Sequence, residues 1–170
     1  LQRSATLKGE LPRVIRPDLL ITETGFAASE LDSVPGGVGL TGWLNRSYAN
    51  AGFNVLGGAN GMIEGFRGIF GEAKKIYLMV SEESATYRPE MRWLAAQLGD
   101  QFQVVDASFS KIDPGDAVYR FFEMFDLANI PAAQMLFALA QDKQIRLTPP
   151  PKTFLEEKMS LALLWNRNLR

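Results

Sequence analysis

The pattern of apolar and polar positions along the chain changes near residue 74. After that point, short apolar runs typical of buried strands alternate with segments whose apolar positions recur every three or four residues, as in an amphipathic helix. The strands are expected within 74–83, 102–108, 117–127 and 145–151, and the strand within 117–127 is expected to continue as a short helix. Further helices are expected within 87–99, 130–143 and 152–165. Strands that alternate with helices predict an α/β fold with a mostly parallel sheet.

Before residue 74 the pattern indicates a β-hairpin followed by two helices. Residues 16–37 read RPDLLITETGFAASELDSVPGG, in which two strand-like stretches flank a polar Glu-Thr-Gly turn. Helices are expected within 40–52 and, with several glycines, within 61–73. The apolar positions that share one face of the first helix are Leu40, Trp43, Leu44 and Tyr48, and those of the helix 87–99 are Met91, Leu94, Ala95 and Leu98. We predict that both faces are buried.

The hairpin sequence also predicts which side chains face one another. If residues 23–25 form a three-residue loop with Gly25 left-handed, Asp18 pairs with Glu30 and Arg16 pairs with Asp32. Because side chains alternate along a strand, all four then project from one face at the base of the hairpin. Opposed carboxylates repel, so something must compensate. Two interpretations remain open: a solvated acidic end screened by Arg16, or a hard divalent cation such as Mg2+ bridging the carboxylates.

The composition narrows the chemistry open to the chain. Its 170 residues are 46% hydrophobic and 22% charged, which suits one globular domain of ordinary size. The chain has no cysteine and no histidine, which excludes disulfides, thiolate nucleophiles and imidazole bases and leaves oxygen ligands for any metal. The net charge of -1 gives no basic excess, so we expect neither nucleic acid nor a membrane as a partner. Without a spanning apolar run or a secretory signal, we expect a cytoplasmic protein.

The motifs Arg-Pro-Asp at 16–18 and Glu-Leu-Asp-Ser-Val-Pro-Gly-Gly at 30–37 resemble the C-terminal part of the ATP-grasp fold, as in D-alanine:D-alanine ligases and glutathione synthetases. In that family an Arg-x-Asp strand is followed by a Glu-x-Asn strand and a Pro-Gly loop. The resemblance implies that Arg16 contacts phosphate and that Asp18, Glu30 and Asp32 bind the magnesium ions of ATP. Asp32 departs from the pattern, because it stands where the family usually has Asn. The extra negative charge leaves open how many metal ions would bind.

The loop that follows the carboxylates contains Gly36 and Gly37. Its backbone could approach a phosphate or a substrate closely, and the same two glycines could simply form a tight turn. We assign them to cofactor binding and keep the tight turn as the alternative.

The order of the motifs resembles a circular permutation of ATP-grasp proteins, as in the glutathionylspermidine synthase-like group. Residues 118–127 and 147–165 are similar to that group's passage back toward the ATP-binding core. The resemblance implies a partial ATP-grasp-like segment with a metal-binding hairpin over 1–73 and a Rossmann-like pre-ATP-grasp domain over 74–170. It also implies a fragment of a longer protein, which we expect to be inactive in isolation.

Two functions of different classes follow. The resemblance implies part of an ATP-dependent carboxylate-amine ligase, which acts through an acylphosphate on an amino-acid or peptide-like substrate. Its cofactors would be Mg2+ and ATP, and its partners ATP and a small carboxylate or amine. The alternative is a non-catalytic α/β binding or scaffold domain.

Several polar residues allow two interpretations. Ser81, Glu82 and Glu83 follow the first buried strand, where ligands of open α/β sheets bind, but they are more typical of an ordinary polar loop. Arg120 could bind a substrate carboxylate or form a structural ion pair with Glu123 or Asp126.

Three tryptophans and one lysine are also candidate functional residues. Trp43, Trp93 and Trp165 lie in amphipathic segments, which predicts core packing. Lys158 resembles the lysine of the helix that leads into an ATP-grasp core, but it also belongs to an ordinary helical charge cluster. We assign it no catalytic role.

Overall fold

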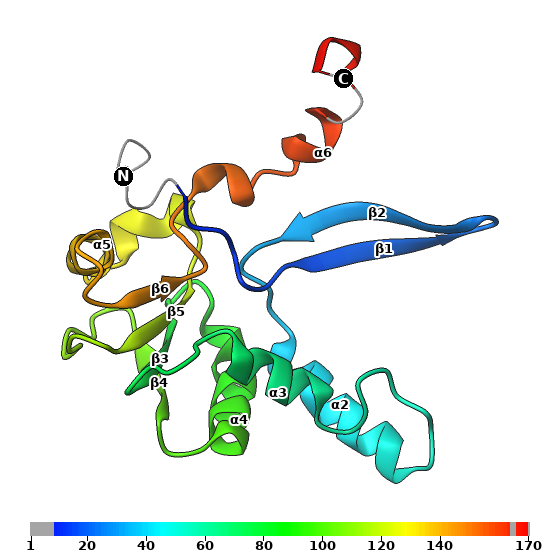
Figure 1. Cartoon of the computed structure of the whole chain (residues 1–170), viewed down its shortest axis with the longest axis horizontal. Helices are drawn as coiled ribbons and strands as arrows, with labels where there is room; N and C mark the ends of the chain where they lie inside the picture. Colours follow the sequence, from blue (N-terminus) through cyan, green and yellow to red (C-terminus); the bar gives the residue numbers. More distant parts are fainter. Residues whose placement is uncertain (1–8, 164–165, 170) are drawn as a thin grey trace.

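The computed structural model describes residues 9–163 and 166–169, and it shows an α/β fold with a separate hairpin (Figure 1). The hairpin comprises β1 (Arg16–Thr22) and β2 (Gly25–Asp32), and two helices follow it, α2 (Val38–Asn50) and α3 (Gly61–Gly68). The sheet comprises β3 (Ile76–Val80), β4 (Phe102–Asp106), β5 (Ala117–Phe121) and β6 (Arg146–Thr148). The remaining α-helices are α4 (Arg88–Leu98), α5 (Ala133–Gln141) and α6 (Met159–Leu163). The predicted α/β fold, with a hairpin before a parallel sheet, is confirmed.

All four sheet strands are parallel and lie in the order β4-β3-β5-β6. From β3 the chain crosses through α4 to β4 on one side, and β5 lies on the other side of β3. The two neighbours of β3 therefore lie on opposite sides, which makes the boundary between β3 and β5 a topological switch point. Ligands of open α/β sheets bind beyond the carboxyl ends of the strands at such a point.

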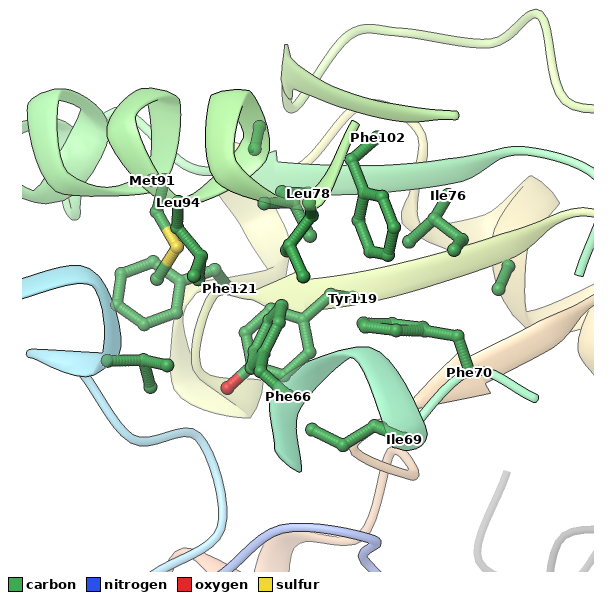
Figure 2. Packing of buried hydrophobic residues seen from close by; sticks show 14 of the residues in the cluster. Phe66, Ile69, Phe70, Ile76, Leu78, Met91, Leu94, Phe102, Tyr119 and Phe121 are labelled. Atoms are coloured by element: carbon green, nitrogen blue, oxygen red, sulfur yellow. The ribbon is translucent and has the colours of Figure 1, made fainter. Parts of the chain in front are cut away.

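Two hydrophobic clusters cover the two faces of the sheet, because alternate strand residues point to opposite sides. On one face, Leu78 and Tyr119 pack with residues of α3 and α4 (Figure 2). On the other face, Met79 and Val118 pack with α5. The central strands β3 and β5 are buried along their whole length, which explains their nearly continuous apolar sequences.

The first of these clusters crosses the predicted boundary at residue 73. Phe66 of α3 packs its ring against that of Tyr119 in β5, with 5.0 Å between ring centroids and a near edge-to-face angle (Figure 2). Val34 and Val38, from the segment just after the hairpin, belong to the same cluster. The boundary at 73 therefore does not coincide with a gap in the core.

Helix α4 packs as its apolar period predicts. Its four buried residues are Met91, Leu94, Ala95 and Leu98. Pro89 in its first turn fits a position where the missing N–H removes no helical bond. Trp93 is half-buried against the first cluster, in agreement with its predicted role.

Helix α2 corrects the prediction for the first helix. Leu40, Trp43 and Tyr48 are each about half exposed, and the helix is buried through Val38, Gly39 and Gly42 instead. A Cβ at Gly39 would lie 2.4 Å from the backbone oxygen of Glu90. The backbone of α2 approaches α4 too closely for larger side chains, so the glycine face is buried and the apolar face is left outside.

The last predicted helix, 152–165, is interrupted. A 3-10 turn at Thr153–Leu155 precedes the short helix α6. Between them, Glu156 and Lys158 form ion pairs with Arg120 and Glu30, which lie far away in sequence. The predicted core position of Trp165 lies outside the described residues.

The hairpin extends away from the sheet and the helices (Figure 1). Several of its large apolar side chains are at least half exposed: Leu19, Leu20, Ile21 and Phe26. None of the helices that the structure describes combines the length and the hydrophobicity needed to cross a bilayer.

Candidate functional site

The base of the hairpin has the predicted register, although its tip does not. The turn contains two residues, 23 and 24, so that Thr22 pairs with Gly25, which corrects the predicted three-residue loop. The one-residue offset that such a loop would supply arises instead from a bulge at Ser29. The Ser29 hydroxyl donates to the backbone oxygen of Asp18 at 3.1 Å.

Below this bulge, Asp18 lies opposite Glu30 and Arg16 lies opposite Asp32. The Arg16 guanidinium bridges two of the carboxylates, at 3.1 Å from Asp18 Oδ1 and 3.3 Å from Asp32 Oδ2. The repulsion expected between opposed carboxylates is therefore partly balanced by Arg16.

Lys158 supplies a second cation to the hairpin base. Its Nζ lies 3.0 Å from Glu30 Oε1. The hydrogen bond and charge of Glu30, followed by the charges of Asp18 and Asp32, raise the pKa of Lys158. Lys158 also belongs to a local charge cluster of the sequence, and no pattern in the sequence predicts its contact with the distant Glu30.

The donor chemistry of Asp18, Glu30 and Asp32 fits Mg2+, since all three offer carboxylate oxygens. Within the described residues, however, no three acidic groups are gathered closely enough to hold a metal ion. In this arrangement Arg16 and Lys158 take the positions beside the carboxylates. The magnesium site stays a prediction, and it requires these cations to move.

Gly36 and Gly37 join the hairpin to α2 in a tightly packed turn. Arg16 Nη1 donates to the backbone oxygen of Gly36 at 3.1 Å, and a Cβ at Gly36 would lie 2.6 Å from the Tyr87 ring. Gly37 has φ 79°, which favours glycine. Its N–H donates to Glu90 Oε1 at 2.8 Å, so in this arrangement the start of α2 is capped by a carboxylate of α4.

A cavity of about 130 Å³ lies between the hairpin base and the carboxyl ends of β3 and β5. Its lining residues come from the hairpin, from the loop after β3 and from the end of β5: Arg16, Asp32, Val34, Gly36, Ser84, Tyr87, Phe121, Phe122 and Glu123. The cavity therefore lies at the switch point of the sheet, and Arg16, Asp32 and Gly36 are the predicted site residues that reach it.

The polar loop after β3 is organised by its own contacts. Ser81 is buried, and its hydroxyl accepts a hydrogen bond from the backbone N–H of Ser84. Glu82 forms an ion pair of 2.7 Å with Arg88, at the start of α4. These contacts give Ser81 and Glu82 a structural role in shaping one wall of the cavity.

Arg120 is fully buried, and its ion-pair partner is Glu156 rather than the predicted Glu123 or Asp126. The guanidinium donates to Glu156 Oε1 at 2.6 Å and to the backbone oxygens of Pro149 and Pro150. Glu156 could not be predicted as the partner, because the two residues are far apart along the chain. Arg120 thus fixes the segment after β6 against the end of β5.

Glu123 is a lining residue that sequence analysis did not select for the site. Burial raises its pKa to about 8, and the hydrogen bond and charge of Glu156 and the charge of Asp32 act in the same direction. The only signal in the sequence was its place just after the strand that contains Arg120.

A larger cavity, of about 380 Å³, lies where β5 and β6 begin. Its charged lining residues have both signs: Glu10, Arg13, Glu72, Asp116, Lys143 and Arg146. Ligands of open α/β sheets bind beyond the carboxyl ends of the strands, so the smaller cavity is the better candidate.

No protein-family model, curated protein or solved structure matches the chain.

Proposed function

We propose that the chain is part of an ATP-dependent carboxylate-amine ligase, in which the hairpin base helps to bind Mg2+ and the phosphates of ATP. The observation that supports this best is the pairing of Asp18 with Glu30 and of Arg16 with Asp32 beside the switch point of a parallel sheet.

Each residue has a chemically suitable role. Asp18, Glu30 and Asp32 offer the hard oxygen donors that Mg2+ prefers. When bound, the metal would neutralise charge on the transferred phosphoryl group. Arg16 offers a guanidinium that can bind phosphate through paired hydrogen bonds. Gly36 and Gly37 would hold the loop close to the substrate.

In the proposed reaction, a carboxylate oxygen first attacks the γ-phosphorus of ATP, the bond from this phosphorus to the β-phosphate oxygen breaks, and ADP leaves. The amine then forms a C–N bond while phosphate leaves with the electron pair of the broken C–O bond. None of these steps requires histidine or cysteine, which agrees with a sequence that lacks both.

The alternative, a non-catalytic binding or scaffold domain, is favoured by a different observation. Arg16 and Lys158 already neutralise the carboxylates of the hairpin base, and Glu90 already caps the start of α2. In a scaffold these contacts would be permanent, whereas in a ligase Mg2+ and ATP would displace part of them.

The Glu30→Gln variant separates the two functions, because it removes one charge while keeping the size of the side chain. We expect Mg2+ to raise the melting temperature of the wild-type 170-residue chain and to have a smaller effect on the variant. The matched control is Glu83→Gln, which makes the same change at an exposed position after β3. Equal Mg2+ effects on all three proteins would contradict the proposed metal role.

ATP turnover is measured separately, as phosphate release with candidate amino acids and peptides. Loss of a metal ligand should lower the rate at least tenfold, which corresponds to about 1.4 kcal/mol of transition-state stabilisation. Unchanged phosphate release in Glu30→Gln would exclude the role assigned to this residue.

A further inference from the structure

Glu123 differs from the other acidic residue that lines the small cavity. Asp32 forms an ion pair with Arg16, whereas no ion pair in the described part of the chain includes Glu123. Arg120, whose charge acts on Glu123, forms its own ion pair with Glu156. Of the carboxyl groups of Asp32, Glu123 and Glu156, two are paired with Arg16 and Arg120. Glu123 has no cation partner among the described residues.

Because burial raises the pKa of Glu123, its carboxyl group carries a proton that it can release. With a pKa of about 8, Glu123 is mostly protonated at neutral pH. A cation that enters the cavity would favour the ionised form and release the proton. The geometry therefore combines a carboxyl group that is hydrogen-bonded to Glu156, and has no cation partner among the described residues, with a space of about 130 Å³ beside it.

Two buried hydroxyl groups, on side chains that do not themselves line this cavity, have no hydrogen-bond partner in the structure. The Tyr119 side chain has no exposed surface, and its hydroxyl is unpartnered. Burial raises the pKa of Tyr119, and the charges of Asp32 and Glu123 raise it further, so both carboxyl groups act on its hydroxyl. Ser33, which follows Asp32, is also buried with an unpartnered hydroxyl.

The remaining walls favour an organic cation over a metal ion. Tyr87, Phe121 and Phe122 line the same cavity. The Tyr87 and Phe121 rings lie edge to face, with 5.2 Å between centroids. Aromatic faces attract ammonium groups, whereas Mg2+ requires a nearly complete shell of oxygen ligands.

We infer that this cavity binds the ammonium group of a small amine and that Glu123 is the carboxylate that pairs with it. The inference rests on the proposed function, in which the ligand would be the amine substrate. Binding converts a neutral Glu123 carboxyl group and an ammonium ion into an ion pair and one free proton. The volume suits an ammonium group with two or three carbon atoms.

Isothermal titration of the 170-residue chain with ethylammonium chloride tests this inference without ATP or Mg2+. A ligand with three non-hydrogen atoms can reach a Kd of about 1 mM at best. We expect millimolar binding at neutral pH that releases up to one proton per site, measured by comparing buffers with different heats of ionisation. Potassium chloride and sodium acetate are the control titrants.

The variants Glu123→Gln and Glu83→Gln make the same substitution at the cavity and at the exposed loop after β3. We expect Glu123→Gln to weaken ethylammonium binding at least tenfold and to abolish proton release, and Glu83→Gln to change neither. Carbon-13 NMR of the Glu123 carboxyl group gives a second readout, because its titration midpoint should lie near 8 and fall when ethylammonium is added.

Several results would overturn the inference. These are no binding at about 100 mM ethylammonium, equal binding of potassium, or unchanged binding and proton release in Glu123→Gln. The test is independent of the ligase proposal. Ammonium binding in a protein that releases no phosphate from ATP would remove the ligase role alone, and phosphate release without ammonium binding would remove this inference alone.

Discussion

The guanidinium of Arg120, which has no exposed surface, lies 2.6 Å from the carboxylate of Glu156. The other oxygen of Glu156 accepts a hydrogen bond from the backbone N–H of Met124 at 2.7 Å. These contacts connect the end of β5 to the segment after β6, and they hold Glu156 beside Glu123. The pair therefore organises one wall of the small cavity as well as the fold around it.

Arg120→Met should lower the free energy of unfolding by about 3–5 kcal/mol, because it leaves Glu156 buried without its cation. The matched control is Arg67→Met, which removes the exposed Arg67–Glu64 pair and should cost less than about 1 kcal/mol. Urea unfolding of the two variants and the wild type measures both values. Similar losses in the two variants would show that the Arg120 pair is no more important than a surface contact.

Gly39→Ala tests the close approach of α2 to α4. The added Cβ would lie 2.4 Å from the Glu90 backbone oxygen, and backbone atoms cannot move aside easily. We expect a loss of about 1–3 kcal/mol in the free energy of unfolding. Gly65→Ala in α3 is the control, because its Cβ would meet no atom within 4 Å, and it should stabilise the helix by about 0.5–1 kcal/mol. Stabilisation by both variants would contradict the observed packing.

Helix α2 also shows where sequence periodicity fails. Its apolar residues lie on one face, as predicted, but the buried face is the one that contains Gly39 and Gly42. Glycine contributes no hydrophobic signal, so its value for close packing becomes visible only when the neighbouring helix is in place. Helix α4, by contrast, contains no glycine, and its apolar period correctly predicted all four buried residues.

The hairpin shows a different limit. The prediction that Asp18 faces Glu30 depended on a three-residue turn, and the pairing holds although the turn contains only two residues. The turn is one residue shorter than predicted, and the bulge at Ser29 restores the register. No local sequence pattern predicts this bulge. Glu123 could not be predicted as a site residue, because its raised pKa results from burial and from Glu156, which a different part of the chain supplies.

The pH dependence of stability provides a test of Glu123. Its pKa is raised from 4.5 to about 8 in the folded state, so folding favours the protonated form. The resulting stabilisation is complete below pH 4.5 and is lost as the pH rises through about 8. Relative to wild type, Glu123→Gln should therefore gain stability between about pH 5 and about pH 8.5, by at most about 1.4 kcal/mol per pH unit.

Urea unfolding of wild type, Glu123→Gln and Glu83→Gln at several pH values within this window measures the effect. The difference between wild type and Glu83→Gln should stay nearly constant, because Glu83 is exposed. A constant difference for Glu123→Gln as well would show that Glu123 titrates in the folded protein as an ordinary glutamate.

Lys158 provides the sharpest test of the predicted metal site, because it occupies the position beside Glu30 that a cation would need. If Mg2+ competes with Lys158, Lys158→Met should strengthen Mg2+ binding by removing the competitor. At ten times the Kd, bound Mg2+ should raise the melting temperature by about 3–6 °C, and this rise should require less Mg2+ in Lys158→Met than in wild type. Lys111→Met, at an exposed position between β4 and β5, is the matched control and should respond as wild type does. Adding Glu30→Gln to Lys158→Met should reverse the gain, since it removes a proposed ligand. If Mg2+ has the same effect on wild type and on every variant, the carboxylates of the hairpin base serve only as partners of Arg16 and Lys158, and the scaffold function is favoured.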